Sequence, residues 1–184
     1  MSESEQKSIL EMLERIGRLT QAEQWTNDLN PTQLAALKYL ARANRFSRAP
    51  SHVADYLGTT RGTVSQTLKA LVRKGLIKEV RSDADRRSIR YDLCAGHDQA
   101  LDVETSIAKA VAQMGAEELR PLSEGLRNLL TTTLEMRGNR TFGMCNSCKH
   151  HHKQADGKAY CALLKVDLEP HQTTQICHEH SRAA

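Results

Sequence analysis

The chain has 184 residues, a formal net charge of +4 and an aromatic content of 4%. So few aromatic residues exclude a large aromatic-rich β-sandwich, and the length suits one ordinary domain with a small addition. The polar N-terminus does not resemble a signal peptide, and no apolar run approaches the roughly 18–20 residues that span a bilayer. We therefore expect a mainly helical, soluble protein of the cytoplasm.

Four helices are predicted in the first half of the chain. Apolar residues at helical spacing between Ile9 and Leu19 indicate an amphipathic first helix. Asn30-Pro31-Thr32-Gln33 combines an N-cap residue, a first-turn proline and a glutamine three residues after the cap, so a second helix starts there. Glycines at positions 58 and 75 end the third and fourth helices. The predicted ranges are about 9–19, 31–43, 50–57 and 60–74.

After Gly75 the periodicity changes from helical to alternating. Residues 76–81 and 88–93 are predicted to form two strands, joined by a polar hairpin loop at 82–87. Two further helices are predicted at about 97–116 and 119–137. Short helix, turn, helix and hairpin, in that order, make up a winged helix-turn-helix.

The helix that begins at Thr60 has short hydroxyl, amide and basic side chains on its outer face. Hydroxyls approach phosphates closely, glutamine pairs with adenine, and arginine or lysine reaches guanine or phosphate. Residues 60–90 contain nine basic and three acidic residues, a net +6 that exceeds the charge of the whole chain. This focused charge predicts binding to double-stranded DNA. The candidate contacts on the helix are Thr60, Arg61, Thr63, Ser65, Gln66 and Lys69.

The stretch from Gly75 to Gly96, with Asp83-Ala84-Asp85-Arg86-Arg87 in its loop, resembles the wing of the MarR family of bacterial regulators. The preceding helix, with Thr63-Val64-Ser65, Leu68 and Leu71, is similar as well, and the resemblance extends over about residues 8–137. It implies a homodimer held by the first and the last two helices. Each recognition helix would enter a major groove, with Arg86 or Arg87 in the minor groove and Asp83 bracing these arginines.

The resemblance has further implications. A two-fold dimer implies a pseudo-palindromic operator with half-sites about 34–36 Å apart, and DNA binding that weakens steeply with salt. It also implies a bacterial, nucleoid-associated protein of the cytoplasm. The chain departs from the family at Cys94, where threonine is usual. We interpret Cys94 either as a packing residue at the strand end or as a reactive thiol.

Residues 139–184 differ in composition from residues 1–138, and we predict that they form a small separate module. Four of the five cysteines and six of the eight histidines lie there. Cys145 and Cys148 form a Cys-x-x-Cys pair, and Cys161 and Cys177 follow downstream. Because cytoplasmic thiols stay reduced, this set predicts a metal centre rather than disulfides. With so few large apolar residues, the module would depend on its metal to fold.

Two kinds of metal centre fit the module. The four cysteines are an all-thiolate set that suits an iron–sulfur cluster, with [4Fe–4S] favoured. Their spacing, with Tyr160 before the third cysteine, resembles that of high-potential iron–sulfur proteins. The alternative is Zn²⁺ held by Cys145, Cys148, Cys177 and His180, with Cys161 left over. The run His150-His151-His152 is expected to be solvated, although its place beside Cys148 also allows a role next to the ligands.

The main functional hypothesis is a DNA-binding regulator whose cluster senses redox state, oxygen, nitric oxide or iron supply. The alternative is a regulator with a structural zinc site and a small-molecule effector between the dimerisation helices and the winged domain. A cluster-dependent enzyme or electron carrier is a remote third hypothesis, because the sequence has no Ser/His/Asp order and no phosphate-binding glycine loop. We predict no catalytic residue.

Overall fold

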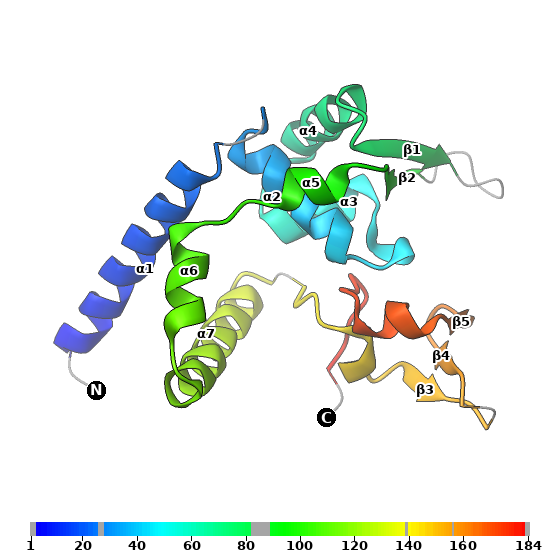
Figure 1. The fold of residues 1–184 in the computed structure, drawn as a ribbon. Helices are drawn as coiled ribbons and strands as arrows, with labels where there is room; N and C mark the ends of the chain where they lie inside the picture. The colour runs from blue at the N-terminus through cyan, green and yellow to red at the C-terminus, as the bar shows by residue number, and fades with distance from the viewer. Residues whose placement is uncertain (1–2, 26–27, 82–88, 139, 156, 183–184) are drawn as a thin grey trace.

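The structure, a computed structural model, describes residues 3–25, 28–81, 89–138, 140–155 and 157–182. Its elements are α1 (Glu3–Glu23), α2 (Pro31–Arg42), η1 (Arg45–Ser47), α3 (Pro50–Leu57), α4 (Arg61–Arg73), β1 (Ile77–Arg81), β2 (Ile89–Leu93), α5 (His97–Leu101), α6 (Ser106–Gln113), α7 (Ala116–Met136), η2 (Cys145–Ser147), β3 (His151–Lys153), β4 (Ala159–Cys161), β5 (Val166–Leu168) and η3 (Pro170–Thr174). Figure 1 shows a winged-helix body of α2 to α5 with β1 and β2, an arm of α1, α6 and α7, and a C-terminal segment with β3 to β5. The prediction of a mainly helical chain with a small hairpin wing is confirmed. None of the helices in the described ranges is both long and apolar enough to cross a membrane.

Local sequence signals set the helix ends in the winged-helix body. The Asn30 side chain accepts a hydrogen bond from the Gln33 N–H (2.9 Å), and the Gln33 side chain accepts one from the Asn30 N–H (3.3 Å), so α2 has the predicted capping box. α3 ends at Gly58 (φ 61°), in the left-handed conformation that glycine adopts without strain. Thr60 Oγ1 accepts a hydrogen bond from the Thr63 N–H (3.2 Å) and caps α4.

The hydrophobic interior of the winged-helix body lies where α2, α3 and α4 meet. Val64, Leu68 and Leu71 on the inner side of α4 are fully buried, as predicted. β1 and β2 pair antiparallel, with Ile77 opposite Leu93, and pack against the three helices. Burial of apolar surface, worth about 25 cal/mol per Å², is the main stabilising term for this body. The other buried members of the core are Leu29, Leu34, Ala36, Leu37, Tyr39, Leu40, Ala43, Val53, Ala54, Ile77, Tyr91 and Ile176.

The prediction of one helix over residues 97–116 is wrong, because the chain forms two helices, α5 and α6, separated by residues 102–105. Val103 in this gap packs against the winged-helix core. The Thr105 side chain accepts a hydrogen bond from the Ala108 N–H (3.2 Å) and starts α6 anew. α7 begins at Ala116 rather than at 119, since the Glu118 side chain accepts a hydrogen bond from the N–H of residue 115 (3.1 Å).

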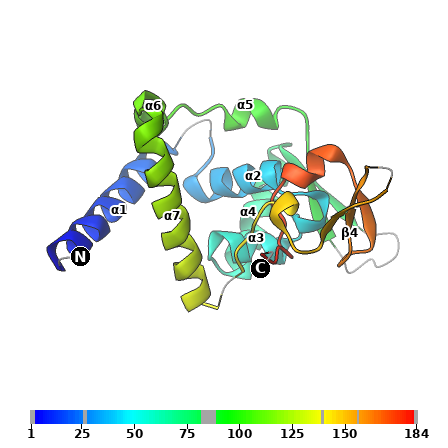
Figure 2. The same cartoon turned by 90° about the horizontal axis from the view of Figure 1, so that it is seen from below.

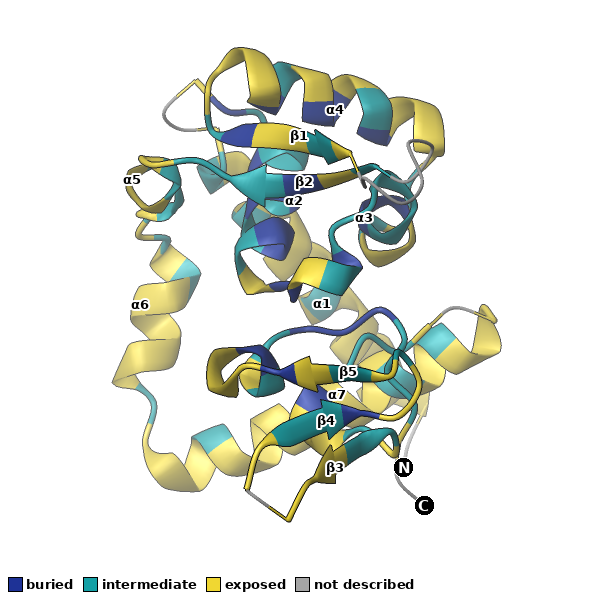
Figure 3. Ribbon diagram, turned by 90° about the vertical axis from the view of Figure 1, so that its right-hand side faces the viewer, coloured by how far each residue is buried: buried dark blue, intermediate teal, exposed yellow. Residues whose placement is uncertain are grey.

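The arm of α1, α6 and α7 is almost entirely exposed, as Figure 3 shows. None of the residues in these three helices is buried. Glu23 at the end of α1 accepts hydrogen bonds from the N–H (2.7 Å) and the hydroxyl of Ser106 at the start of α6. Apolar side chains nevertheless face the solvent on all three helices: Ile9, Leu10, Met12, Ile16, Leu19, Val111, Leu122, Leu126, Leu129 and Leu130.

The C-terminal segment is built around the antiparallel sheet β3–β4–β5, with β4 in the middle. In Figures 1 and 2 it lies on the side of the winged-helix body away from α1. Ile176 connects the two parts, since its carbonyl accepts a hydrogen bond from the Asn44 N–H (2.9 Å) and its own N–H donates to the Arg42 carbonyl (2.8 Å). Its side chain joins the winged-helix core. The segment is therefore docked onto the body at the end of α2.

Candidate functional site

The outer side of α4 carries the predicted DNA-contacting side chains. The Oγ1 atoms of Thr60 and Thr63 lie 2.9 Å apart at the start of the helix, so both hydroxyls hold fixed positions there. Backbone N–H groups at a helix N-terminus, with hydroxyls and an arginine beside them, suit a phosphate. One of the six predicted residues, Ser65, is half-buried. The other five are exposed: Thr60, Arg61, Thr63, Gln66 and Lys69.

The predicted minor-groove residues Arg86 and Arg87 lie outside the described residues, as does Asp83. In the described part of the hairpin, Arg81 pairs with Glu79 (3.0 Å) and Arg90 lies 3.6 Å from Asp92. The hairpin therefore carries basic side chains that acidic neighbours hold in place.

Arg48 joins the hairpin to the helix-turn-helix, a contact that no local pattern predicts. Its guanidinium donates to the Ala43 carbonyl (3.0 Å) and to the Asp92 carboxylate (3.5 Å), while its own carbonyl accepts a hydrogen bond from the Tyr91 N–H (3.1 Å). The Arg48 side chain is largely buried, where a charge-assisted hydrogen bond gains strength. Arg48 thus ties β2 to the chain between α2 and α3.

The four cysteines of the C-terminal segment come together from three places in its fold. Cys145 begins η2 and Cys148 follows it, Cys161 ends β4, and Cys177 lies after η3. Backbone hydrogen bonds fix this arrangement: the Cys145 N–H donates to the Gln175 carbonyl (3.2 Å), and the Cys177 N–H donates to the carbonyl of residue 143 (2.9 Å). Cys145, Cys161 and Cys177 are buried, and Cys148 is half-buried.

The neighbouring thiols affect the ionisation of Cys145 and Cys177. Burial, and then the nearby thiols of Cys177, Cys161 and Cys148, raise the pKa of Cys145 to about 11. Burial also raises the pKa of Cys177, against hydrogen bonds to its sulfur from the side chains of Asn44 and Ser47. Burial thus disfavours the thiolate forms of Cys145 and Cys177, whereas a bound cation would stabilise them.

No three cysteine sulfurs in the described chain all lie within 4.8 Å of one another. A metal site needs at least three His, Cys, Asp or Glu side chains whose ligand atoms lie close together. In the described chain, the group whose ligand atoms all lie within 4.8 Å of one another is His52, His178 and Glu179, and it includes no cysteine. Around one tetrahedral Zn²⁺, with Zn–S near 2.3 Å, thiolate sulfurs lie about 3.8 Å apart. In this structure no three cysteine sulfurs of the described chain therefore have the mutual distances of thiolates bound to one Zn²⁺.

His180, the alternative zinc ligand, has other partners for both ring nitrogens. Its Nε2 lies 3.1 Å from the Ser147 hydroxyl and its Nδ1 lies 3.5 Å from the Thr141 hydroxyl. The ring rests on the backbone of Gly143, where a Cβ atom would overlap it. A glycine at this position thus lets His180 pack closely.

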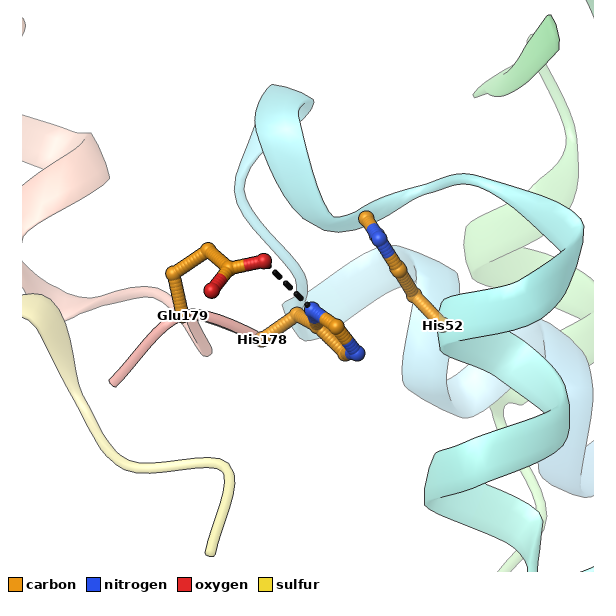
Figure 4. Close-up of side chains that lie close together, drawn as sticks. All are labelled: His52, His178 and Glu179. Atoms are coloured by element: carbon orange, nitrogen blue, oxygen red, sulfur yellow. Dashed lines mark hydrogen bonds and ion pairs between the residues drawn. The ribbon is translucent and has the colours of Figure 1, made fainter. Parts of the chain in front are cut away.

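Figure 4 shows a cluster that the sequence analysis missed, in which His52 of α3 meets His178 and Glu179 of the C-terminal segment. The two imidazole rings stack with centroids 3.7 Å apart and planes 17° apart. His178 Nδ1 lies 3.1 Å from Glu179, and His178 Nε2 lies 3.1 Å from Asp55 of α3. Burial, and then the charge of His178, lower the pKa of His52 to about 4.

This histidine cluster meets the distances of a metal site but not its directions. An imidazole binds a metal along a lone pair in its own ring plane, and the lone pairs of two nearly parallel stacked rings do not converge on one ion. The cluster instead connects the C-terminal segment to α3. The His178 N–H also donates to the Ser47 hydroxyl (2.9 Å), and Phe142 packs edge-on against Tyr56 at 5.2 Å.

Comparison with known proteins identifies the winged-helix body. Residues 27–88 match the model of the MarR family. A MarR transcriptional regulator from Methanosarcina mazei Go1 (20% identity, TM-score 0.60, 71% of this chain and 99% of that chain) and the transcriptional regulator BldR from Sulfolobus solfataricus (20%, 0.58, 72% and 99%) share the fold. FabT of Streptococcus pneumoniae, solved in complex with DNA, is 26% identical with a TM-score of 0.54 over 71% of this chain and 98% of FabT. No curated protein matches the chain in sequence.

The predicted resemblance to the MarR family is confirmed for this part of the chain. The matches include almost the whole of each of these solved chains but only 71–72% of the present chain. More than a quarter of the present chain therefore has no counterpart in them.

Proposed function

We propose that this chain is a MarR-type transcriptional regulator that binds operator DNA as a homodimer and holds a [4Fe–4S] cluster on Cys145, Cys148, Cys161 and Cys177. The carrying observation is that one winged helix presents an exposed basic recognition helix on one side and is tied on the other to a segment in which four cysteines converge. The similar structures are those of regulators, so we propose a regulatory rather than an enzymatic role.

DNA binding rests on α4 and the hairpin. FabT, which was solved with DNA, is similar to this chain over 71% of the chain. The basic and hydroxyl side chains of α4 suit a major groove, and the hairpin arginines suit the adjacent backbone or minor groove. Neutralising phosphates releases counterions, so the affinity for DNA should fall linearly on a logarithmic scale as salt increases.

Dimerisation rests on the arm. Leu10 on α1 is 66% exposed and Leu130 on α7 is 60% exposed, although both lie among apolar neighbours at helical spacing. Monomeric proteins rarely leave such continuous apolar faces in water, and a second copy of the same arm would cover them. Two copies would place two α4 helices for two half-sites of a pseudo-palindrome.

The cysteine geometry favours an iron–sulfur cluster over zinc. A [4Fe–4S] cluster binds each thiolate to a different iron, so its four sulfurs are farther apart than those around one ion. This agrees with the absence of any three cysteine sulfurs within 4.8 Å among the described residues. His180 is engaged by the hydroxyls of Ser147 and Thr141, which leaves an all-cysteine set.

The C-terminal segment reaches the helix-turn-helix through its own ligand residues. The sulfur of Cys177 accepts hydrogen bonds from Asn44, the N-cap of η1, and from Ser47, the last residue of η1. The next residue, His178, contacts Asp55 and His52 on α3. When bound, a cluster of this kind supplies a redox centre that oxidants and nitric oxide attack. Cysteines released from it are no longer held together by shared metal bonds, which loosens the attachment of Cys177 and His178 to α3 and shifts the spacing of the two recognition helices.

The experiment that tests this proposal is anaerobic purification of the full chain with iron and sulfide analysis. We expect a brown protein with an absorbance band at about 400 nm and roughly four iron ions and four sulfide ions per chain. Cys161→Ser should abolish the colour, and Cys94→Ser is the matched control. His180→Ala should leave the cluster intact, whereas it would remove zinc from the alternative site. A colourless protein that contains one zinc would overturn the cluster proposal.

A second candidate function is favoured by a cavity of about 630 Å³ between α1 and the start of α2. Its position, between the arm and the winged-helix body, is where a small-molecule effector could set their relative placement. In this alternative the metal in the C-terminal segment is a structural zinc ion. The cavity is lined by Arg18, Gln21, Ala22, Trp25, Asn30, Pro31 and Thr32.

A further inference from the structure

The three consecutive histidines after Cys148 are not equivalent in the structure. His152 is exposed, as expected for a solvated run, and His150 is half-buried. His151 differs from both, because its Nε2 atom is buried and has no hydrogen-bond partner among the described residues. Burying a ring nitrogen without a hydrogen-bond partner lowers the stability of the folded chain, so the position of this atom needs an explanation.

The strand register places His151 on the cysteine side of the sheet. His151 in β3 lies directly opposite Cys161 in β4 of the antiparallel pair, and residues directly opposite one another project to the same face. The His151 N–H also donates to the Cys148 carbonyl (3.0 Å), which holds the start of β3 next to a second cysteine. His152, the next residue along the strand, projects to the other face.

A neutral imidazole carries one N–H, and the sulfur atoms of a metal–thiolate centre are the hydrogen-bond acceptors expected on that face. Nε2 has no hydrogen-bond partner among the described residues, and a centre held by the cysteines would supply acceptors on the same face of the sheet. A donor to sulfur stabilises the reduced form of an iron–sulfur centre, because that form carries more negative charge.

We propose that His151 donates an Nε2–H hydrogen bond to a sulfur atom of the centre held by the four cysteines and thereby raises its reduction potential. This inference rests on the proposed function, since it requires an iron–sulfur cluster at that site. His151 is then a positioning residue that sets the potential at which the centre changes its oxidation state.

The test is the midpoint potential of the full-length, anaerobically purified protein, measured by redox titration of its visible absorbance. His151→Phe, which removes the donor, should lower the potential, and His151→Gln, which keeps an N–H donor, should restore a large part of the difference. His152→Phe is the matched control and should leave the potential unchanged. Equal potentials in wild type and His151→Phe overturn the inference.

A second measurement needs no variant. Protein grown with ¹⁵N-labelled histidine is examined by pulsed EPR in the paramagnetic state of the cluster. A weak ¹⁵N coupling is the expected signature of a hydrogen-bonded imidazole. No coupling, or the strong coupling of an imidazole bound directly to iron, overturns the inference while leaving the cluster established. A wild-type protein that is colourless overturns the proposed function itself, and the inference with it.

Discussion

The winged-helix body and the C-terminal segment lie next to each other but differ in the kinds of residue that they bury. The core of the body contains fifteen buried residues in the described chain, most of them leucine, valine, isoleucine, alanine and tyrosine. The separate cluster in the C-terminal segment contains three, and two of these are Cys145 and Cys161. Apolar burial is therefore the main stabilising term in the body, whereas under the proposed function the segment depends on the centre that its cysteines bind.

The two regions also have different roles in the proposed function. In the proposed function the capped α4 of the body contacts DNA, and the four cysteines of the segment hold the centre that receives the signal. A regulator gains from this division, because a change in the weakly stabilised part is transmitted to the stable part through a few contacts. Those contacts are the Ile176 backbone pairs and the His178 bridge to Asp55.

The largest expected effect comes from removing the metal. Treating the loaded protein with an oxidant and an iron chelator should unfold the C-terminal segment and leave the winged-helix body folded, because only the segment depends on its ligands. Limited trypsin digestion monitored by mass spectrometry measures this. Cleavage should appear at the exposed lysines Lys149, Lys153, Lys158 and Lys165. If the metal-free segment resists trypsin as well as the loaded one does, the two regions do not differ in this way.

Leu68→Ala tests the other side of the comparison. Leu68 is fully buried in α4, so truncation should lower the free energy of unfolding by about 2–5 kcal/mol through lost burial and a residual cavity. Urea unfolding followed by circular dichroism measures the loss. The iron content of the variant should equal that of wild type at low urea. An iron content that falls in step with stability would show that the two regions fold as one unit.

Removing charges from α4 should weaken DNA binding without changing metal content. Arg61→Ala and Lys69→Ala should each lower the slope of log affinity against log salt by about 0.9, which corresponds to one phosphate contact. Fluorescence anisotropy with a labelled duplex of about 30 base pairs measures the slope. Lys165→Ala, an exposed lysine of the C-terminal segment, is the control and should bind DNA as wild type does. Equal losses in all three variants would remove α4 from the interface.

The smallest expected effect is a pH dependence at the junction of the two regions. The pKa of His52 falls to about 4 in the folded chain, below its ordinary value of 6.5. Between those values the unfolded chain binds a proton that the folded chain does not, so the contribution of His52 to stability is complete above pH 6.5 and is lost as the pH falls toward 4. His52→Gln should therefore lose less unfolding free energy than wild type between pH 6.5 and 4. Parallel pH profiles for the two proteins would contradict this assignment.

Much of the winged helix could be predicted because its signals are local. The capping box of Asn30 and Gln33, the left-handed Gly58 and the Thr60 cap each act within four residues. The break between α5 and α6 was missed because the packing of Val103 against the body, which no local pattern reveals, interrupts a run with helical periodicity.

The amino-acid sequence by itself determined the winged helix, the focused positive charge and the set of four cysteines, because spacing along the chain is enough to reveal each of them. Tertiary structure decided the rest. His178 and Asp55 are separated by 123 residues in the chain, and His151 acquires its buried position only when β3 pairs with β4. Contacts of this kind depend on how apolar surfaces pack, and no periodicity along the chain encodes which distant polar groups that packing brings together.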